Sequence, residues 1–291
     1  MPATMSLTIY HTYPFKLVYL PPEGVFYLQN EKGAIWVRKN LIQAVSLLSG
    51  ICLLLLLFGF GLTIQNPEKE SVSMDMPEVT ADEDGKHILA IGDSLTRGFG
   101  DSKGQGYTGY LIEHLQESSN DKITLQNLAI SGSSTDQWLE QVKQKKVQRQ
   151  VEQADVILMT IGANDLFQEG KTINNFNTQT VDELRKQYLV NLQEILTELR
   201  TLNAQAPIFF IGLYNPLIDT NNADLITRVV RQWNFETSLL LDKYHKTVFV
   251  PVFDLFQSNV NDYLYKDKFH PNTKGYKLIA KRITPLVEKG A

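Results

Sequence analysis

Three residue types that together perform nucleophilic catalysis occur in short, turn-like segments of the chain. Ser94 stands in the sequence Gly-Asp-Ser-Leu, and His270 follows Asp267 by three residues in a segment that ends in a proline. A serine hydroxyl is a weak nucleophile until a neighbouring base takes its proton. An imidazole can be that base, and a carboxylate that accepts its other ring N–H fixes the tautomer. The pattern predicts Ser94 as nucleophile, His270 as base and Asp267 as the orienting acid.

Such a reaction also needs hydrogen-bond donors for the negative oxygen of its intermediate. Gly132 has no side chain, so its backbone N–H can approach a substrate closely. Asn164 offers a side-chain amide, and Ser94 offers its own backbone N–H. Removal of one such donor typically costs about 2.7–4 kcal/mol of transition-state stabilisation. We expect these three residues to form an oxyanion hole.

Alternating apolar and amphipathic segments are expected to position these groups. Continuous apolar strands that alternate with helices are typical of a parallel sheet covered on both faces. Ligands of such sheets meet the carboxyl ends of the strands, and the serine, glycine and asparagine each follow one of the first three. The strands are expected at 87–91, 123–130, 156–161, 208–213 and 248–252, and the helices at 108–116, 137–153, 181–202, 223–244 and 272–288.

Four segments carry a resemblance to a known family. GDSL at 92–95, NLAISG ending at Gly132, GAND at 162–165 and DKFHP at 267–271 resemble the four sequence blocks of the GDSL, or SGNH, hydrolases. The sequence looks most similar to bacterial GDSL-type lipases and acylhydrolases. Ala129 departs from the pattern, since many relatives have glycine there.

The resemblance implies a flavodoxin-like three-layer α/β/α sandwich with a parallel five-stranded sheet. It also implies that Ser94 is the nucleophile, that Gly132 and Asn164 help to form the oxyanion hole, and that Asp267 orients His270. The family needs no metal and no organic cofactor, so neither is expected. The implied activity is hydrolysis of carboxylic esters.

Two loops that follow the third and fourth strands should border the cleft. The first, 166–180, contains Phe167, and the second, 214–224, contains Tyr214, Asn215 and Leu217. The aromatic and aliphatic members could hold an acyl chain. The alternative, that these side chains only pack the loops onto the body of the domain, stays open.

An apolar segment precedes the domain. Residues 41–64 contain no charged side chain, and about 20 such residues match the hydrocarbon thickness of a bilayer. Lys32, Arg38 and Lys39 come before the segment, and basic flanks stay in the cytoplasm. We therefore predict a single transmembrane anchor at 41–64, a cytoplasmic N-terminus and an extracytoplasmic domain at 86–291, joined by an acidic linker at 65–85.

Residues 1–40 form the predicted cytoplasmic segment. Their aromatic residues and prolines follow neither a helical nor a strand period. One hypothesis is that this segment is an artefact of the chosen gene start and that translation begins at Val37.

Composition limits the remaining classes of function. The formal net charge is -4 and the basic residues form no stripe, which argues against a nucleic-acid partner. Cys52 is the single cysteine, so intrachain disulfides and paired-cysteine metal sites are excluded. The expected partners are an ester of a small molecule, lipid or glycan, and the membrane through residues 41–64.

Several functions stay open at this stage. The first is an outward-facing esterase or lipase, and the second is a carbohydrate O-acetyl esterase that acts on cell-wall or surface polysaccharide. A third is a non-catalytic module that binds glycan or lipid, although no catalytic position is missing. A nucleotide-binding domain fits poorly, because the glycine-rich segment 98–106 lacks the ending of a phosphate-binding loop.

Overall fold

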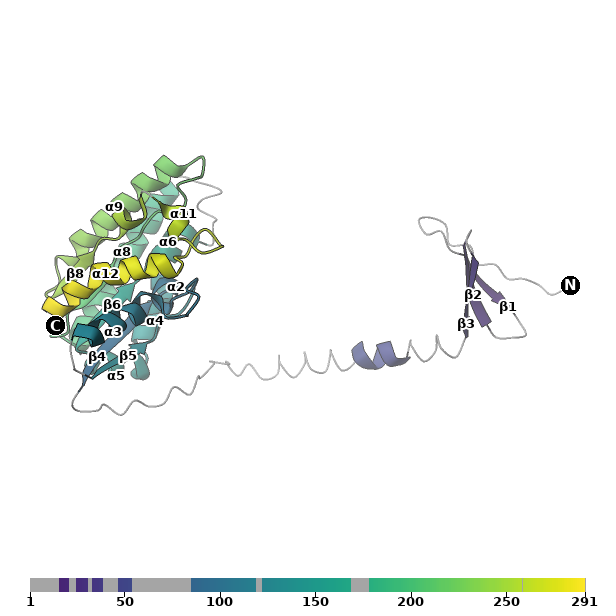
Figure 1. The fold of residues 1–291 in the computed structure, drawn as a ribbon, viewed down its shortest axis with the longest axis horizontal. Helices are drawn as coiled ribbons and strands as arrows, with labels where there is room; N and C mark the ends of the chain where they lie inside the picture. Colours follow the sequence, from purple (N-terminus) through teal and green to yellow (C-terminus); the bar gives the residue numbers. More distant parts are fainter. Residues whose placement is uncertain are drawn as a thin grey trace. The chain divides into compact units, whose positions relative to one another are not determined.

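The computed structural model describes residues 16–20, 25–30, 33–38, 47–53, 85–118, 122–168, 178–257 and 259–290. The chain divides into two compact units, Met1–Glu78 and Val79–Ala291 (Figure 1). The boundary between them falls inside the segment 65–85 that the sequence predicts as a linker.

The first unit contains a small antiparallel sheet. β1 (Lys16–Leu20) pairs with β2 (Val25–Asn30), which pairs with β3 (Gly33–Arg38). The sequence pattern does not predict these strands, because an alternation of only five or six residues between prolines and glycines is a weak signal. They lie within the predicted N-terminal segment 1–40.

The predicted membrane anchor at 41–64 lies largely outside the described residues. Residues 47–53 of it are helical, and their leucine and isoleucine side chains are exposed. Within the described part of the chain, none of the helices has the length and apolar character needed to cross a bilayer. The anchor therefore stays a prediction from the sequence.

The second unit is built on a five-stranded, entirely parallel sheet. Its strand order is β5-β4-β6-β7-β8, which corresponds to the order 2-1-3-4-5 of doubly wound sheets. This confirms the expected α/β fold with a parallel five-stranded sheet. The strands are β4 (Lys86–Gly92), β5 (Ile123–Asn127), β6 (Val156–Thr160), β7 (Ile208–Ile211) and β8 (Thr247–Val250).

Successive strand residues point to opposite faces, so the sheet has two apolar cores. On β4, Leu89 and Ile91 belong to one core, while Ile88 and Ala90 belong to the other. Helices α4, α5, α8 and α9 contribute to the first core, and α3 and α12 pack together over the second (Figure 1). The helices are α2 (Ser94–Arg97), α3 (Gly106–Ser118), α4 (Thr135–Val142), α5 (Lys145–Glu152), α6 (Ala163–Phe167), α8 (Thr178–Leu202), α9 (Ala223–Leu241), α10 (Phe253–Gln257), α11 (Val260–Tyr263) and α12 (Thr273–Gly290).

The helix expected at 137–153 is two helices, α4 and α5. Gln144 has extended backbone angles (φ -75°, ψ 130°) and starts the second helix. A continuous helix would place Lys145 and Lys146 on the same face as the buried Val142. The break at Gln144 instead turns Val147 into the core.

The end of β4 is shaped by a glycine. Gly92 has a φ of +128°, and a Cβ atom there would lie 1.8 Å from the carbonyl oxygen of Thr160 on β6. Its own carbonyl accepts a hydrogen bond from the buried Trp138 indole at 2.8 Å. Because glycine alone fits this close approach, the chain can leave the sheet at Gly92 and begin α2 two residues later.

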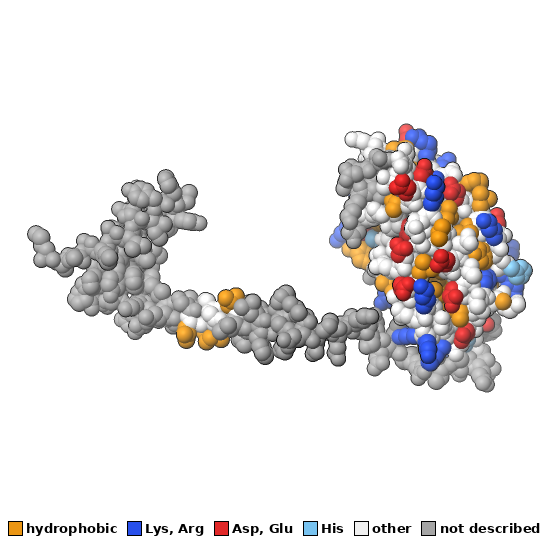
Figure 2. All heavy atoms as spheres, turned by 180° about the vertical axis from the view of Figure 1, so that it is seen from behind, with side chains coloured by type: hydrophobic (Ala, Val, Ile, Leu, Met, Phe, Trp, Pro, Cys, Tyr) orange, Lys and Arg blue, Asp and Glu red, His pale blue; other side chains and the backbone are white. Residues whose placement is uncertain are grey.

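Surface charge is mixed rather than separated by sign. Figure 2 shows basic and acidic side chains interspersed on the face of the second unit that it presents. Arg185, for example, pairs with Asp182 at 2.8 Å and with Glu236 at 3.0 Å. Interspersed charges produce little long-range field of either sign.

Candidate active site

Ser94 is the first residue of α2, directly after the first strand of the parallel sheet. Asp93 caps this helix, since its Oδ1 accepts hydrogen bonds from the backbone N–H of Leu95 at 3.0 Å and from the hydroxyl of Thr160 at 2.8 Å. Asp93 is 2% exposed, and burial raises its pKa. Its carboxyl group therefore holds the turn in place, and Ser94 is presented beyond it.

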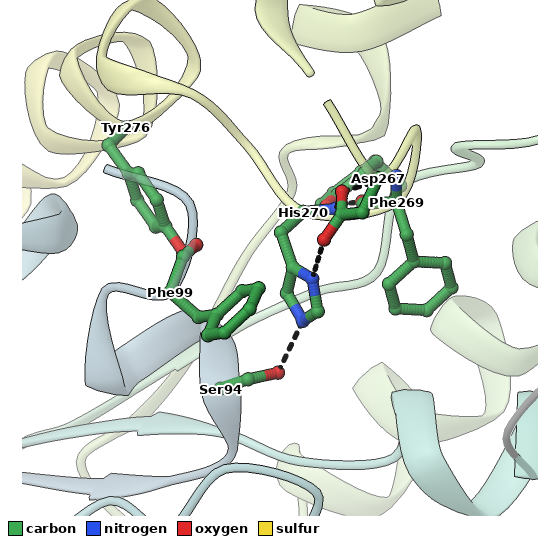
Figure 3. A network of polar contacts seen from close by, with 7 residues as sticks. Ser94, Phe99, Asp267, Phe269, His270 and Tyr276 are labelled. Carbon is green, nitrogen blue, oxygen red and sulfur yellow. Dashed lines mark hydrogen bonds and ion pairs between the residues drawn. The ribbon is translucent and has the colours of Figure 1, made fainter. Parts of the chain in front are cut away.

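The structure brings Ser94, His270 and Asp267 into one line of hydrogen bonds (Figure 3). Ser94 Oγ lies 2.8 Å from His270 Nε2, and His270 Nδ1 lies 2.7 Å from Asp267 Oδ2. An ionised carboxylate can only accept, so the ring proton sits on Nδ1 and the lone pair of Nε2 faces the serine. This is the tautomer that a general base needs.

Asp267 is held ionised by its surroundings. Partial burial alone would raise its pKa, but hydrogen bonds from the His270 ring and from the backbone N–H groups of Phe269 and His270 outweigh burial, so the pKa is lowered. The two backbone donors lie at 2.9 Å and 3.0 Å from Oδ1. These bonds hold the carboxylate in position and stabilise its ionised form.

A short hairpin-like loop presents the histidine. Leu264 and Pro271 form an isolated antiparallel bridge, and the backbone N–H of Tyr265 donates to the carbonyl of His270 at 2.7 Å. The side-chain amide of Asn272 donates to the carbonyl of Leu264 at 2.9 Å. With both ends tied, the loop holds the imidazole over Ser94.

Gly132 and Asn164 line one cavity of about 400 Å³ at the carboxyl end of the sheet. Gly132 has a φ of +81°. Asn164 lies in the first turn of α6, and its amide donates to the carbonyl of Ser133 at 2.9 Å. Since the amide carries two hydrogens, one of them remains for another acceptor. The other lining residues of this cavity are mostly polar: Ser134, Asp136, Asp165, Gln168, Leu184, Gln187 and Tyr188.

Ser94 and His270 line a second, narrower cavity of about 30 Å³ with an apolar wall. Phe167 and Phe269 meet edge to face in this wall, with ring centroids 5.3 Å apart. Tyr214 also lines it, and its hydroxyl donates to the carbonyl of Phe269 at 2.5 Å. The remaining lining residues are Asp93, Leu95, Thr160, Ala163, Leu213 and Pro216.

The four residues expected to contact substrate divide into two pairs. Phe167 and Tyr214 face the narrow cavity with Ser94. Asn215 is 3% exposed and holds its own loop, because its side-chain N–H donates to the hydroxyl of Thr227 and its side-chain Oδ1 accepts from the backbone N–H of Leu217. Leu217 packs against the core. The second pair therefore shapes the loop and does not line this cavity.

Two aromatic residues at the site were not singled out from the sequence. Phe269 immediately precedes His270, so its place next to the predicted base is a signal in the sequence that could have identified it. Phe99 has its ring centroid 4.6 Å from that of His270, although the two residues are far apart in sequence. Phe99 is 48% exposed, and the hydroxyl of Tyr276 donates to its backbone carbonyl at 2.6 Å (Figure 3).

The glycine-rich segment 98–106 is tied to the rest of the site by one carboxylate. Asp101 accepts hydrogen bonds from the hydroxyls of Thr273 at 2.6 Å and Tyr110 at 3.1 Å. It also accepts from the backbone N–H groups of Gln105 and Gly106. The segment that carries Phe99 is thereby joined to the start of α12, next to the histidine loop.

The sequence is similar to a described protein family and to proteins of two Bacillus species. A family model described as the GDSL-like lipase/acylhydrolase family matches residues 90–278. The Bacillus subtilis protein YpmR is 37% identical over 211 residues, which cover 69% of this chain and 81% of that protein. The spore germination lipase LipC of Bacillus licheniformis is 25% identical over 67% of this chain and 92% of its own length.

Two solved structures show the same fold. The lipase Lip_vut3 from a goat rumen metagenome has a TM-score of 0.61 at 22% identity and covers 69% of this chain and 96% of its own. The acetyl xylan esterase Axe2 from Geobacillus stearothermophilus has a TM-score of 0.53 at 23% identity, over 69% of this chain and 94% of its own.

One carboxyl group beside the larger cavity titrates far from its ordinary range. Burial raises the pKa of Asp165 to about 6, against the opposing effect of hydrogen bonds from Thr135. The fold therefore favours the protonated carboxyl. The stability that this contributes is fully present below about pH 3.8 and is lost as the pH rises through about 6.

Asp165→Asn removes this titration. The parent loses stability as this carboxyl ionises, and the variant does not. We therefore expect the free energy of unfolding of the variant, relative to that of the parent, to rise by up to about 3 kcal/mol from pH 4 to pH 7. Urea unfolding followed by tryptophan fluorescence at several pH values measures the difference. Asp254→Asn is the control that should show little change over this range, because a hydrogen bond from Arg282 lowers the pKa of Asp254 from its ordinary value of 3.8 and so keeps this carboxyl ionised above pH 4. A difference between Asp165→Asn and parent that stays flat over this range would contradict the assignment.

Proposed function

The chain belongs to the GDSL-like lipase/acylhydrolase family of ester hydrolases, and we propose that it cleaves carboxylic esters through Ser94, His270 and Asp267. The observation that carries this proposal is the unbroken line of hydrogen bonds from Ser94 Oγ through the imidazole to Asp267. Each partner is held by its own turn or loop, so the arrangement exists before substrate binds. Preorganised groups of this kind lower a barrier because no reorganisation is needed during the reaction.

The reaction has two halves. His270 Nε2 takes the proton of Ser94 Oγ, which bonds to the ester carbonyl carbon and gives a tetrahedral oxyanion. His270 then gives that proton to the leaving alcohol oxygen as its bond to carbon breaks, and an acyl-serine remains. Water attacks the acyl-serine with the same histidine as base, and the carboxylic acid and free Ser94 are released.

Three donors are proposed for the oxyanion. The backbone N–H of Ser94 is at the first position of a helix, where N–H groups have no acceptor within the helix. Gly132 offers a backbone N–H on an exposed turn, and Asn164 offers the amide hydrogen that Ser133 does not use. Loss of one such donor costs on the order of 10²–10³-fold in kcat.

The narrow cavity supports a short acyl group. Its volume of about 30 Å³ is lined by aromatic and aliphatic side chains around Ser94. Water itself needs about 10–15 Å³ of such space, so the cavity suits a group the size of a methyl or ethyl. Esters of acetate or propionate therefore fit better than esters of long fatty acids.

A second candidate, a carbohydrate O-acetyl esterase, is favoured by the larger cavity. That cavity of about 400 Å³ is lined mainly by hydroxyl, amide and carboxyl groups, and it begins at the proposed oxyanion residues Gly132 and Asn164. Cavities of about 300–1,000 Å³ hold typical small ligands. A short acyl group on one side and a hydroxyl-rich alcohol on the other would match an O-acetylated sugar.

The first test compares the parent chain with Ser94→Ala on p-nitrophenyl acetate, butyrate and octanoate. The parent should hydrolyse the short esters faster than octanoate, and the variant should lose several orders of magnitude in kcat because it lacks the nucleophile. Release of acetate from acetylated glycans, measured in parallel, separates the two candidate functions. Equal, low rates of parent and variant on every ester would leave a non-catalytic binding module.

The proposed location is the outer side of a cell membrane. The apolar segment 41–64, with Lys32, Arg38 and Lys39 before it, supports a single anchor with a cytoplasmic N-terminus. Protease added to intact cells should then degrade the domain at 86–291, which antibodies against that domain would detect. A domain that survives until the cells are lysed would contradict this topology.

A further inference from the structure

Asp165, the neighbour of Asn164 in α6, is bonded to the loop that carries Gly132. Its two carboxylate oxygens each lie 3.1 Å from the backbone nitrogen of Thr135, and the hydroxyl of Thr135 donates to Oδ1. Thr135 is the first residue of α4 and follows Gly132 by three positions. The carboxylate thus holds the start of α4 against the start of α6.

A second bond connects the same two segments. The amide of Asn164 donates to the carbonyl of Ser133 at 2.9 Å. Residue 133 is therefore tied to residue 164, and residue 135 to residue 165. Gly132 follows β5, and Asn164 follows β6. This double connection therefore fixes the distance between two proposed donors, the backbone N–H of Gly132 and the side-chain amide of Asn164.

Helix α8 adds hydrogen bonds to the same connection. The side-chain amide of Asn191, which is 3% exposed, donates to the Thr135 hydroxyl at 3.1 Å and to Asp136 at 2.7 Å. Gln187 in turn donates to Asn191 at 2.8 Å. A network with this many defined partners holds Asp165 and Thr135 in one geometry.

We propose that Asp165, acting through Thr135, is a positioning residue that sets the geometry of the oxyanion hole formed by Gly132 and Asn164. This inference rests on the proposed ester hydrolysis. Asp165 lines the larger cavity beside Gly132 and Asn164 and stands outside the line of hydrogen bonds from Ser94 through His270 to Asp267, so it does not itself transfer the proton. A shift of about 1 Å in a catalytic donor can cost on the order of 10²-fold in rate, which is the effect that Asp165 prevents.

The ionisation of Asp165 argues against a merely stabilising role. Burial raises its pKa to about 6, so above that pH the fold carries a carboxylate that it disfavours. Residues kept at a cost to stability are typical of functional sites. An uncharged replacement can therefore be as stable as the parent at neutral pH and still be a poorer catalyst.

The test uses the full chain in mild detergent with a short-chain p-nitrophenyl ester at pH 8. Asp165→Ala should lower kcat by about 10- to 100-fold and leave KM within about twofold. Asp165→Asn keeps an oxygen for the Thr135 backbone N–H and should lose less. Thr135→Val should lower kcat in the same way, while Thr135→Ser, which keeps the hydroxyl, should stay close to the parent.

A double-mutant cycle separates positioning from general damage. In an Asn164→Ala background, where one donor is already absent, Asp165→Ala should cost less than about threefold in kcat. The matched control is Asp155→Ala, since Asp155 also accepts a backbone N–H, that of His87 at 2.7 Å, but at the amino end of β4. Its kcat should stay within about twofold of the parent.

The outcomes distinguish two failures. A parent chain that hydrolyses no ester, or an equally active Ser94→Ala variant, overturns the proposed function. If the parent is active and Ser94→Ala is inert, then an Asp165→Ala variant with the kcat of the parent overturns the positioning role. The same holds if Asp165→Ala costs as much with Asn164 absent as with it present.

Discussion

The imidazole of His270 has to meet a serine on one side and a carboxylate on the other, and this double contact constrains the rest of the domain. The 2.8 Å distance joins Ser94 to His270, which is 176 positions further along the chain, and the 2.7 Å distance joins His270 to Asp267. The parallel sheet makes this possible because all its carboxyl ends face one side. Gly92 ends the first strand there, and the Leu264–Pro271 bridge shapes the loop that brings the histidine to the same place.

Ser94 can act as the proposed nucleophile only if the turn before it and the loop of Gly132 are also held in place. The Asp93 carboxyl holds the turn before Ser94, and the bonds from residues 164 and 165 hold the loop of Gly132. These contacts involve buried or half-buried polar groups, which are costly unless they are paired. The proposed catalytic groups thus lie among polar side chains that are satisfied by one another, while the two apolar cores on either side of the sheet supply most of the stability.

The sequence predicts those features of the fold and of the site that have local signals. The five strands are short apolar runs, and Ser94, Asn164 and His270 stand in turn-like segments next to them. The break in the helix expected at 137–153 was missed, because it depends on which side chains the core accepts. Phe99 and the Asp165–Thr135 bond were missed for the same reason: each is a contact between segments distant in sequence, and neither residue type is unusual alone.

The central claim is that Ser94 is the nucleophile, and a covalent trap tests it most directly. A fluorophosphonate reacts with a serine that a base has activated, and peptide mass spectrometry locates the adduct. We expect one phosphonyl group per chain, on the peptide that contains Ser94, with loss of esterase activity in proportion to labelling. An adduct on a different residue, or an active enzyme that loses its activity without modification of Ser94, would contradict it.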